Sequence, residues 1–173
     1  MAFWDVSRAH LYGTTQRELF TELPEELARE GYCARLLRSL YGTQDASSIW
    51  QREYTGLFAE HGWKPGISNP AVFYCEESDG RGLCHGDDIC VLADHETIDN
   101  FDAMLRSRYD IKKIANIGPE CSDDREVVML NRTIRCSSGS EYHLEFEADA
   151  KHVQVFTKSL GLDLSLIHIS EPT

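Results

Sequence analysis

Two adjacent aspartates, Asp87 and Asp88, stand directly before the strongly apolar run 89–93. A buried strand in this position would aim the two carboxylates at one fixed point, which is what metal binding needs. A second double aspartate, Asp123 and Asp124, lies in a polar stretch with no such strand beside it. A solvated turn is the ordinary setting for two aspartates, so only the first pair is a candidate for chemistry.

A third carboxylate, Asp5, lies in the apolar setting Phe3-Trp4-Asp5-Val6. If this first strand pairs beside the strand that follows Asp88, the three carboxylates meet. Three acids at one place repel one another, and the repulsion raises their pKa values. Two Mg²⁺ or Mn²⁺ ions would offset the charge and would make a phosphoryl-transfer centre. The alternative is that Asp5 only caps a turn at the end of a strand.

The elements around these acids predict a mixed α+β fold. The sequence of residues 82–93 predicts a β-hairpin that carries the two acids at its tip, because two short apolar runs flank the segment His-Gly-Asp-Asp. Weaker extended segments are expected at 17–23 and 33–41. Further strands are expected at 1–7, 71–75, 110–115, 126–135 and 141–146.

The spacing of apolar residues predicts a helix over 45–61, with Asp45 as its N-cap and Gly62 at its C-terminal end. Trp50, Tyr54 and Phe58 recur at helical spacing there, which favours core packing over a base-stacking platform. A second helix follows from Ile98, Phe101, Leu105 and Tyr109, and a third is expected near 149–160.

The composition limits the classes of function. The 173 residues hold 17 basic and 29 acidic side chains, a net charge of −12, which argues mildly against a polynucleotide partner. No stretch approaches the roughly 18 consecutive apolar residues of a membrane span, and no secretory signal is visible at the start. The six cysteines are scattered without a C-x-x-C pair, so a reducing, intracellular setting is the simplest interpretation.

Four blocks in order carry a resemblance to a known family. Residues 5–13, Asp-Val-Ser-Arg-Ala-His-Leu-Tyr-Gly, resemble motif A of copia-type retrotransposon reverse transcriptases, Asp-Val-x-x-Ala-Phe-Leu-x-Gly. Residues 36–50 are similar to the family's Leu-Tyr-Gly-Leu-x-x-Ala-Pro-x-x-Trp block, and residues 68–73 to the segment before the catalytic hairpin. His85-Gly86-Asp87-Asp88 matches the position of Tyr-Val-Asp-Asp.

The resemblance implies a reverse-transcriptase palm, an antiparallel sheet with helices on one face, from an incomplete right-hand polymerase. It implies that Asp5 and Asp87 hold two Mg²⁺ (or Mn²⁺) ions and that Asp88 is a third, less essential acid. The implied reaction is attack of a primer 3′-OH on the α-phosphate of a dNTP, directed by an RNA or DNA template.

The resemblance also implies a set of substrate-binding residues. His10 falls where the family has the aromatic residue that excludes the ribose 2′-OH, and His85 replaces the family's tyrosine. Gly42 and Gln44 are implied to lie near the incoming nucleotide or the template. Lys112 falls near the motif D lysine, a candidate proton donor to pyrophosphate.

The resemblance divides the chain into a palm fragment at 1–135 and the start of a thumb or connection region at 136–162. Residues 165–173, Ser-Leu-Ile-His-Ile-Ser-Glu-Pro-Thr, look like a translated sequencing adapter, so we expect a non-native tail at 163–173; the alternative is a native β-like tail. The family's fingers, RNase H and integrase regions are not in the chain, so we expect a polyprotein fragment that is inactive alone. A cytoplasmic virus-like particle or the nucleus is the implied location.

Two rival interpretations remain at this point. The chain could be a catalytically dead retroelement remnant that acts at most as a binding module, which metal titration would distinguish from an enzyme. It could also be a phospho-accepting receiver-type domain, which requires a parallel βαβ alternation rather than a hairpin.

Overall fold

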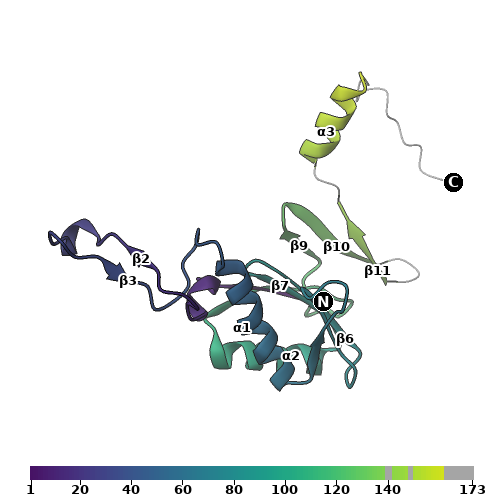
Figure 1. Cartoon of the computed structure of the whole chain (residues 1–173). Coiled ribbons are helices and arrows are strands. Elements are labelled where there is room, and N and C mark those ends of the chain that lie inside the picture. Colours follow the sequence, from purple (N-terminus) through teal and green to yellow (C-terminus); the bar gives the residue numbers. More distant parts are fainter. Residues whose placement is uncertain (139–141, 148–149, 162–173) are drawn as a thin grey trace. The chain divides into compact units, whose positions relative to one another are not determined.

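A computed structural model describes residues 1–138, 142–147 and 150–161 of the chain (Figure 1). The chain divides into two compact units, one formed by residues 1–116 and the other beginning at Ile117. The predicted domain bounds at 135 and 162 stay predictions, and the predicted non-native tail at 163–173 lies outside the described residues.

The first unit is built on one six-stranded sheet in the order β4-β5-β6-β7-β1-β8. Every neighbouring pair of strands in it is antiparallel. This contradicts the receiver-type alternative, which needs parallel strands. The strands are β1 (Ala2–Val6), β4 (Trp63–Pro65), β5 (Val72–Cys75), β6 (Gly80–His85), β7 (Asp88–Leu92) and β8 (Ile111–Asn116).

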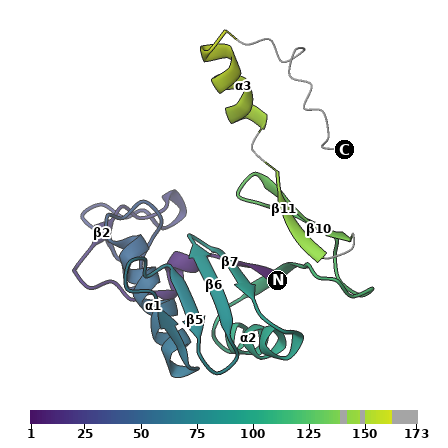
Figure 2. The same ribbon diagram turned by 90° about the vertical axis from the view of Figure 1, so that its right-hand side faces the viewer.

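The helices α1 (Ala46–Glu60) and α2 (His95–Arg108) pack on one face of this sheet (Figure 2). The order β1-α1-β6-β7-α2-β8 is a split β-α-β arrangement, in which the first strand is inserted between β7 and β8. The insertion places the N-terminal strand in the interior of the sheet, directly beside the hairpin.

Alternation along β1 defines the core. Trp4 and Val6 are fully buried on the helix side, where the Trp4 ring lies 5.4 Å from that of Phe101. The Trp4 indole donates a 2.8 Å hydrogen bond to Asp102 on α2, so Trp4 joins strand and helix both by ring packing and by a hydrogen bond. Phe58 of α1 lies 5.3 Å from Phe101, which closes the core between the two helices.

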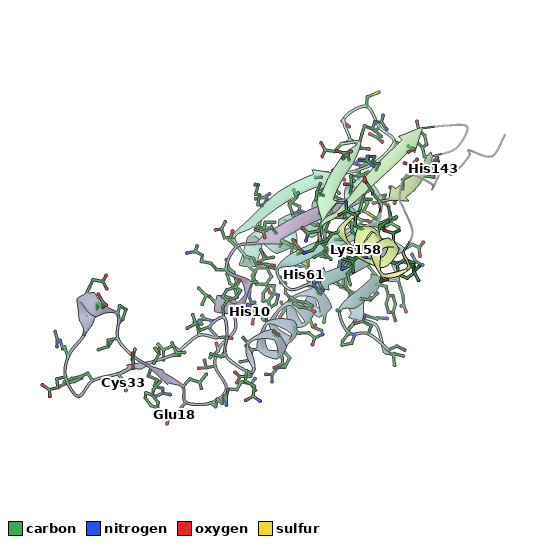
Figure 3. The ribbon with its side chains drawn as sticks, turned by 90° about the horizontal axis from the view of Figure 1, so that it is seen from above. His10, Glu18, Cys33, His61, His143 and Lys158 are labelled. Atoms are coloured by element: carbon green, nitrogen blue, oxygen red, sulfur yellow. The ribbon has the colours of Figure 1, made fainter. Side chains whose placement is uncertain are left out.

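A long arm separates β1 from α1. After the 3₁₀ helix η1 (Ala9–Tyr12), the chain runs out and back through β2 (Phe20–Thr21), the 3₁₀ helix η2 (Glu25–Leu27) and β3 (Ala34–Arg35). Figure 3 shows Glu18 and Cys33 on this arm, away from His10. The strands are much shorter than the extended segments predicted at 17–23 and 33–41, because the arm is exposed and buries little apolar surface.

The second unit contains β9 (Glu126–Met129), β10 (Arg132–Ser138), β11 (Tyr142–Phe146) and α3 (Ala150–Ser159). The single strand predicted over 126–135 is wrong. Leu130 and Asn131 both have positive φ, 50° and 59°, so they form a hairpin turn that splits the segment into two antiparallel strands. The turn contains neither glycine nor proline, and Leu130 continues the apolar run 127–129, so the sequence gives only a weak turn signal.

The other predicted elements are present with shifts at their ends, whereas β4 and the 3₁₀ helices η1 and η2 were not predicted. Asp45 occupies the N-cap of α1, but its carboxylate makes no capping hydrogen bond and instead pairs with Arg17 at 3.2 Å. Within the described residues, no helix is both long and apolar enough to span a membrane.

Two glycine substitutions test the packing of the sheet. A Cβ added at Gly82 would overlap the Phe73 ring, whereas one added at Gly56, on the exposed side of α1, would meet nothing. We expect Gly82→Ala to lower the free energy of unfolding by about 1–3 kcal/mol. Gly56→Ala should raise it by about 0.5–1 kcal/mol. Chemical denaturation of both variants checks this, and equal shifts of one sign would contradict the packing described.

Candidate metal centre

Three carboxylates from two distant parts of the sequence meet in the first unit. Asp5, Asp87 and Asp88 each offer one oxygen, and these oxygens all lie within 4.8 Å of one another. All three side chains are partly buried. The juxtaposition that the sequence predicts for these acids is therefore present in the fold.

Strand pairing creates this cluster. Asp5 of β1 is the direct register partner of Asp88 of β7, and directly opposite residues project from the same face of an antiparallel pair. Val6 and Ile89, the next residues along each strand, are fully buried on the helix side. The carboxylates consequently project from the face of the sheet that the two helices leave uncovered.

The hairpin turn before Asp88 is held from two sides. The backbone N–H of Val6 donates to the carbonyl of Asp87 at 2.9 Å, so β1 extends its ladder into the turn. The indole of Trp50, on α1, donates to the carbonyl of Gly86 at 2.7 Å. Gly86 has a φ of 65°, a conformation that glycine adopts without strain, and it is therefore suited to this turn.

The negative charge of the cluster affects the pKa of Asp88. Partial burial raises the pKa of its carboxyl, and the charges of Asp87 and Asp5 raise it further, while His85 opposes the shift. Oxygen ligands from several carboxylates suit hard divalent cations such as Mg²⁺ and Mn²⁺. The donor set thus fits such an ion. A bound ion would reduce the repulsion from Asp5 and Asp87 that helps to raise the pKa of Asp88.

A pocket of about 490 Å³ opens beside the hairpin, and both predicted substrate-binding histidines, His10 and His85, line it. Gln51 and Tyr54 of α1 line it as well. The His10 ring packs edge-on against Tyr41, with 4.3 Å between centroids. Its Nδ1 is buried and has no hydrogen-bond partner in the part of the chain described.

The other predicted site residues lie elsewhere. Gly42 and Gln44 are exposed in the turn that precedes α1, and neither lines this pocket nor joins the carboxylate cluster. Lys112 is exposed on β8, where it is the register partner of Asp5. Residues 130–132, which the resemblance implies to lie near the family's primer-grip strand, belong to the second unit, at the turn between β9 and β10.

Asp123 differs from the solvated turn predicted for the second double aspartate. It is only 8% exposed, and its carboxylate accepts a 3.0 Å hydrogen bond from the backbone N–H of Glu120. The physical reason is local: the carboxylate caps its own loop and needs no neighbouring strand.

The helical spacing of Trp50 predicts a core residue but not its hydrogen bond to the Gly86 carbonyl. The ring is indeed buried among Tyr12, Tyr54 and Tyr109. Helical periodicity reports the burial of a side chain but says nothing about where an indole N–H points. Cys84 also reaches Gly86 O, at 3.7 Å, and its burial raises the pKa of the thiol to about 12, so it remains neutral there.

Replacing Trp50 tests the support of the hairpin. Trp50→Phe keeps an aromatic ring but leaves the Gly86 carbonyl without its indole donor, which should cost about 1–3 kcal/mol of stability. It should also weaken Mn²⁺ binding, because Asp87 follows the released carbonyl. Trp63→Phe is the control, since Trp63 packs against Phe73 and Phe101 away from the hairpin turn. Calorimetric Mn²⁺ titration decides: equal affinities for the two variants would contradict a positioning role.

Comparison with known proteins gives one match. The model of the family described as reverse transcriptase (RNA-dependent DNA polymerase) matches residues 1–121, a range that includes all the candidate residues of the carboxylate cluster and the pocket. No curated protein and no solved structure matches the chain. Since the match covers well over half of the 173 residues, the chain belongs to the reverse transcriptase (RNA-dependent DNA polymerase) family.

Proposed function

We propose that the chain is the catalytic palm portion of a copia-type retrotransposon reverse transcriptase, with residues 1–135 as the palm. The proposed reaction is nucleotidyl transfer from a dNTP to a primer 3′-OH. The observation that carries the proposal is the meeting of Asp5, Asp87 and Asp88 within 4.8 Å on an open sheet face, in a chain of this family. A polymerase needs such a cluster and a purely structural turn does not.

Asp5 and Asp87 would hold two Mg²⁺ or Mn²⁺ ions, with Asp88 as an additional acid. Such ions activate the attacking hydroxyl and stabilise the charge that develops on the transferring phosphate. The part played by the protein is to fix the carboxylates before the substrates arrive. β1 does so from inside the sheet, and Trp50 does so at the hairpin turn.

The pocket lined by His10 and His85 is proposed to take part of the incoming nucleotide or the primer end. The aromatic lining supports this, because the rings of His10, His85 and Tyr54 could stack on a sugar or a base. Gly42 and Gln44 are proposed to contact the nucleotide or the template from the turn before α1. Lys112 is proposed to lie near the departing pyrophosphate.

The partners proposed on family grounds are an RNA or DNA template-primer and the remainder of a polyprotein. The proposed setting is a cytoplasmic virus-like particle or the nucleus. The net charge of −12 disfavours tight, nonspecific binding of nucleic acid by this chain, so bound cations would matter for the approach of a polyanion as well as for catalysis.

The metal site can be tested with two chemically identical changes. Asp87→Asn removes one carboxylate ligand and should weaken Mn²⁺ binding by at least about tenfold. Replacing even a residue that only hydrogen-bonds to a metal ligand lowers metal affinity by about that factor. Asp124→Asn changes the net charge equally and should leave the affinity unchanged, because Asp124 is outside the cluster. Isothermal titration with Mn²⁺ compares both variants with the parent chain.

The same titration separates the two functions considered. Equal affinities in Asp87→Asn and Asp124→Asn, or no binding by the parent, would contradict the polymerase proposal and favour the inactive remnant. If the metal site is present, primer extension on an RNA template should be lost with Asp87→Asn and kept with Asp124→Asn. Both variants are made in a longer polypeptide that itself extends primers. The 173-residue chain alone is expected to show no extension.

A further inference from the structure

We propose that Lys112 is a counter-charge for the carboxylate cluster, which stabilises the metal-free state and competes with divalent cations for Asp5. The proposal rests on the metal site proposed above and gives Lys112 a role in positioning charge. The observation behind it is a row of register partners that crosses four strands: His85, Asp88, Asp5 and Lys112.

The register places Lys112 on the same face as the cluster. In the β1–β8 pair, Asp5 is opposite Lys112, whereas Trp4 is opposite Lys113. The Lys113 ammonium lies over the Trp4 ring, 5.7 Å from its centroid, which fixes Lys113 on the helix side. Because successive residues of a strand point to opposite faces, Lys112 projects from the open face together with Asp5.

Lys112 is also available to act there. Its side chain is exposed, and no ion pair engages its ammonium among the residues described. Arg8, another cation close to Asp5 in the sequence, pairs instead with Asp110 at 3.8 Å. The row therefore has acids at its centre, with a histidine at one end and a lysine at the other.

The sign of the effect follows from the charges. Without metal, the Lys112 ammonium faces a group of like-charged carboxylates and lowers their repulsion. A bound dication cancels most of this negative charge, so the same ammonium loses attraction to the cluster and is repelled by the ion itself. Lys112 therefore favours the empty site, and removing its charge should tighten metal binding.

The test compares two neighbouring lysines. Lys112→Met should tighten Mn²⁺ binding by about two- to fivefold, the range expected for charges directly opposite on paired strands. Lys113→Met removes the same charge from the other face and should leave the Mn²⁺ affinity unchanged. Titrations at low ionic strength, without nucleotide, measure both, and the difference should shrink as salt is added.

A metal-free readout tests the counter-charge independently. In EDTA, Lys112→Met should lower the melting temperature, and the loss should disappear in an Asp5→Asn background, where the partner charge is gone. Unchanged or weaker Mn²⁺ binding by Lys112→Met would overturn the proposal, as would equal shifts for both lysine variants. Failure of the metal site itself would look different: the parent and Asp5→Asn would bind Mn²⁺ alike, or neither would bind it.

Discussion

Three carboxylate oxygens within 4.8 Å of one another repel, and the fold must resist that repulsion wherever no cation is bound. The resistance comes from pairing a strand near the N-terminus with a hairpin more than eighty residues later. Because β1 lies inside the sheet, with hydrogen-bonded partners on both sides, Asp5 cannot move away from Asp88 without breaking two ladders. The constraint is therefore met by backbone hydrogen bonds.

The two helices also help to hold the carboxylates in place, from the other face of the sheet. Trp4 attaches β1 to α2 through Asp102, and Trp50 attaches α1 to the hairpin through the Gly86 carbonyl. Each indole combines a large buried ring with one directed N–H, so burial and orientation are supplied by a single side chain. The aromatic core thus does more than add apolar burial, since it transmits the rigidity of two helices to the acids on the opposite face.

Much of this organisation is readable from the sequence, and the misses have physical causes. The buried strand after Asp88 and the helical spacing of Trp50, Tyr54 and Phe58 were predicted, because burial imposes a period on the chain. The hairpin at Leu130–Asn131 was missed, since its turn contains neither glycine nor proline although both turn residues have positive φ. The hydrogen bond from the Trp50 indole to Gly86 depends on the orientation of the side chain, and the placement of Lys112 opposite Asp5 depends on strand register. The spacing of apolar residues encodes neither.

The central claim is that this sheet face is a site for divalent cations. The most direct measurement is a crystal of the chain grown with Mn²⁺ and examined by anomalous scattering at the manganese edge. The account predicts an anomalous peak within ligand distance of Asp5 and Asp87, with a second ion about 3.5–4 Å away when nucleotide is added. A crystal with manganese bound elsewhere, and none at these carboxylates, would contradict it.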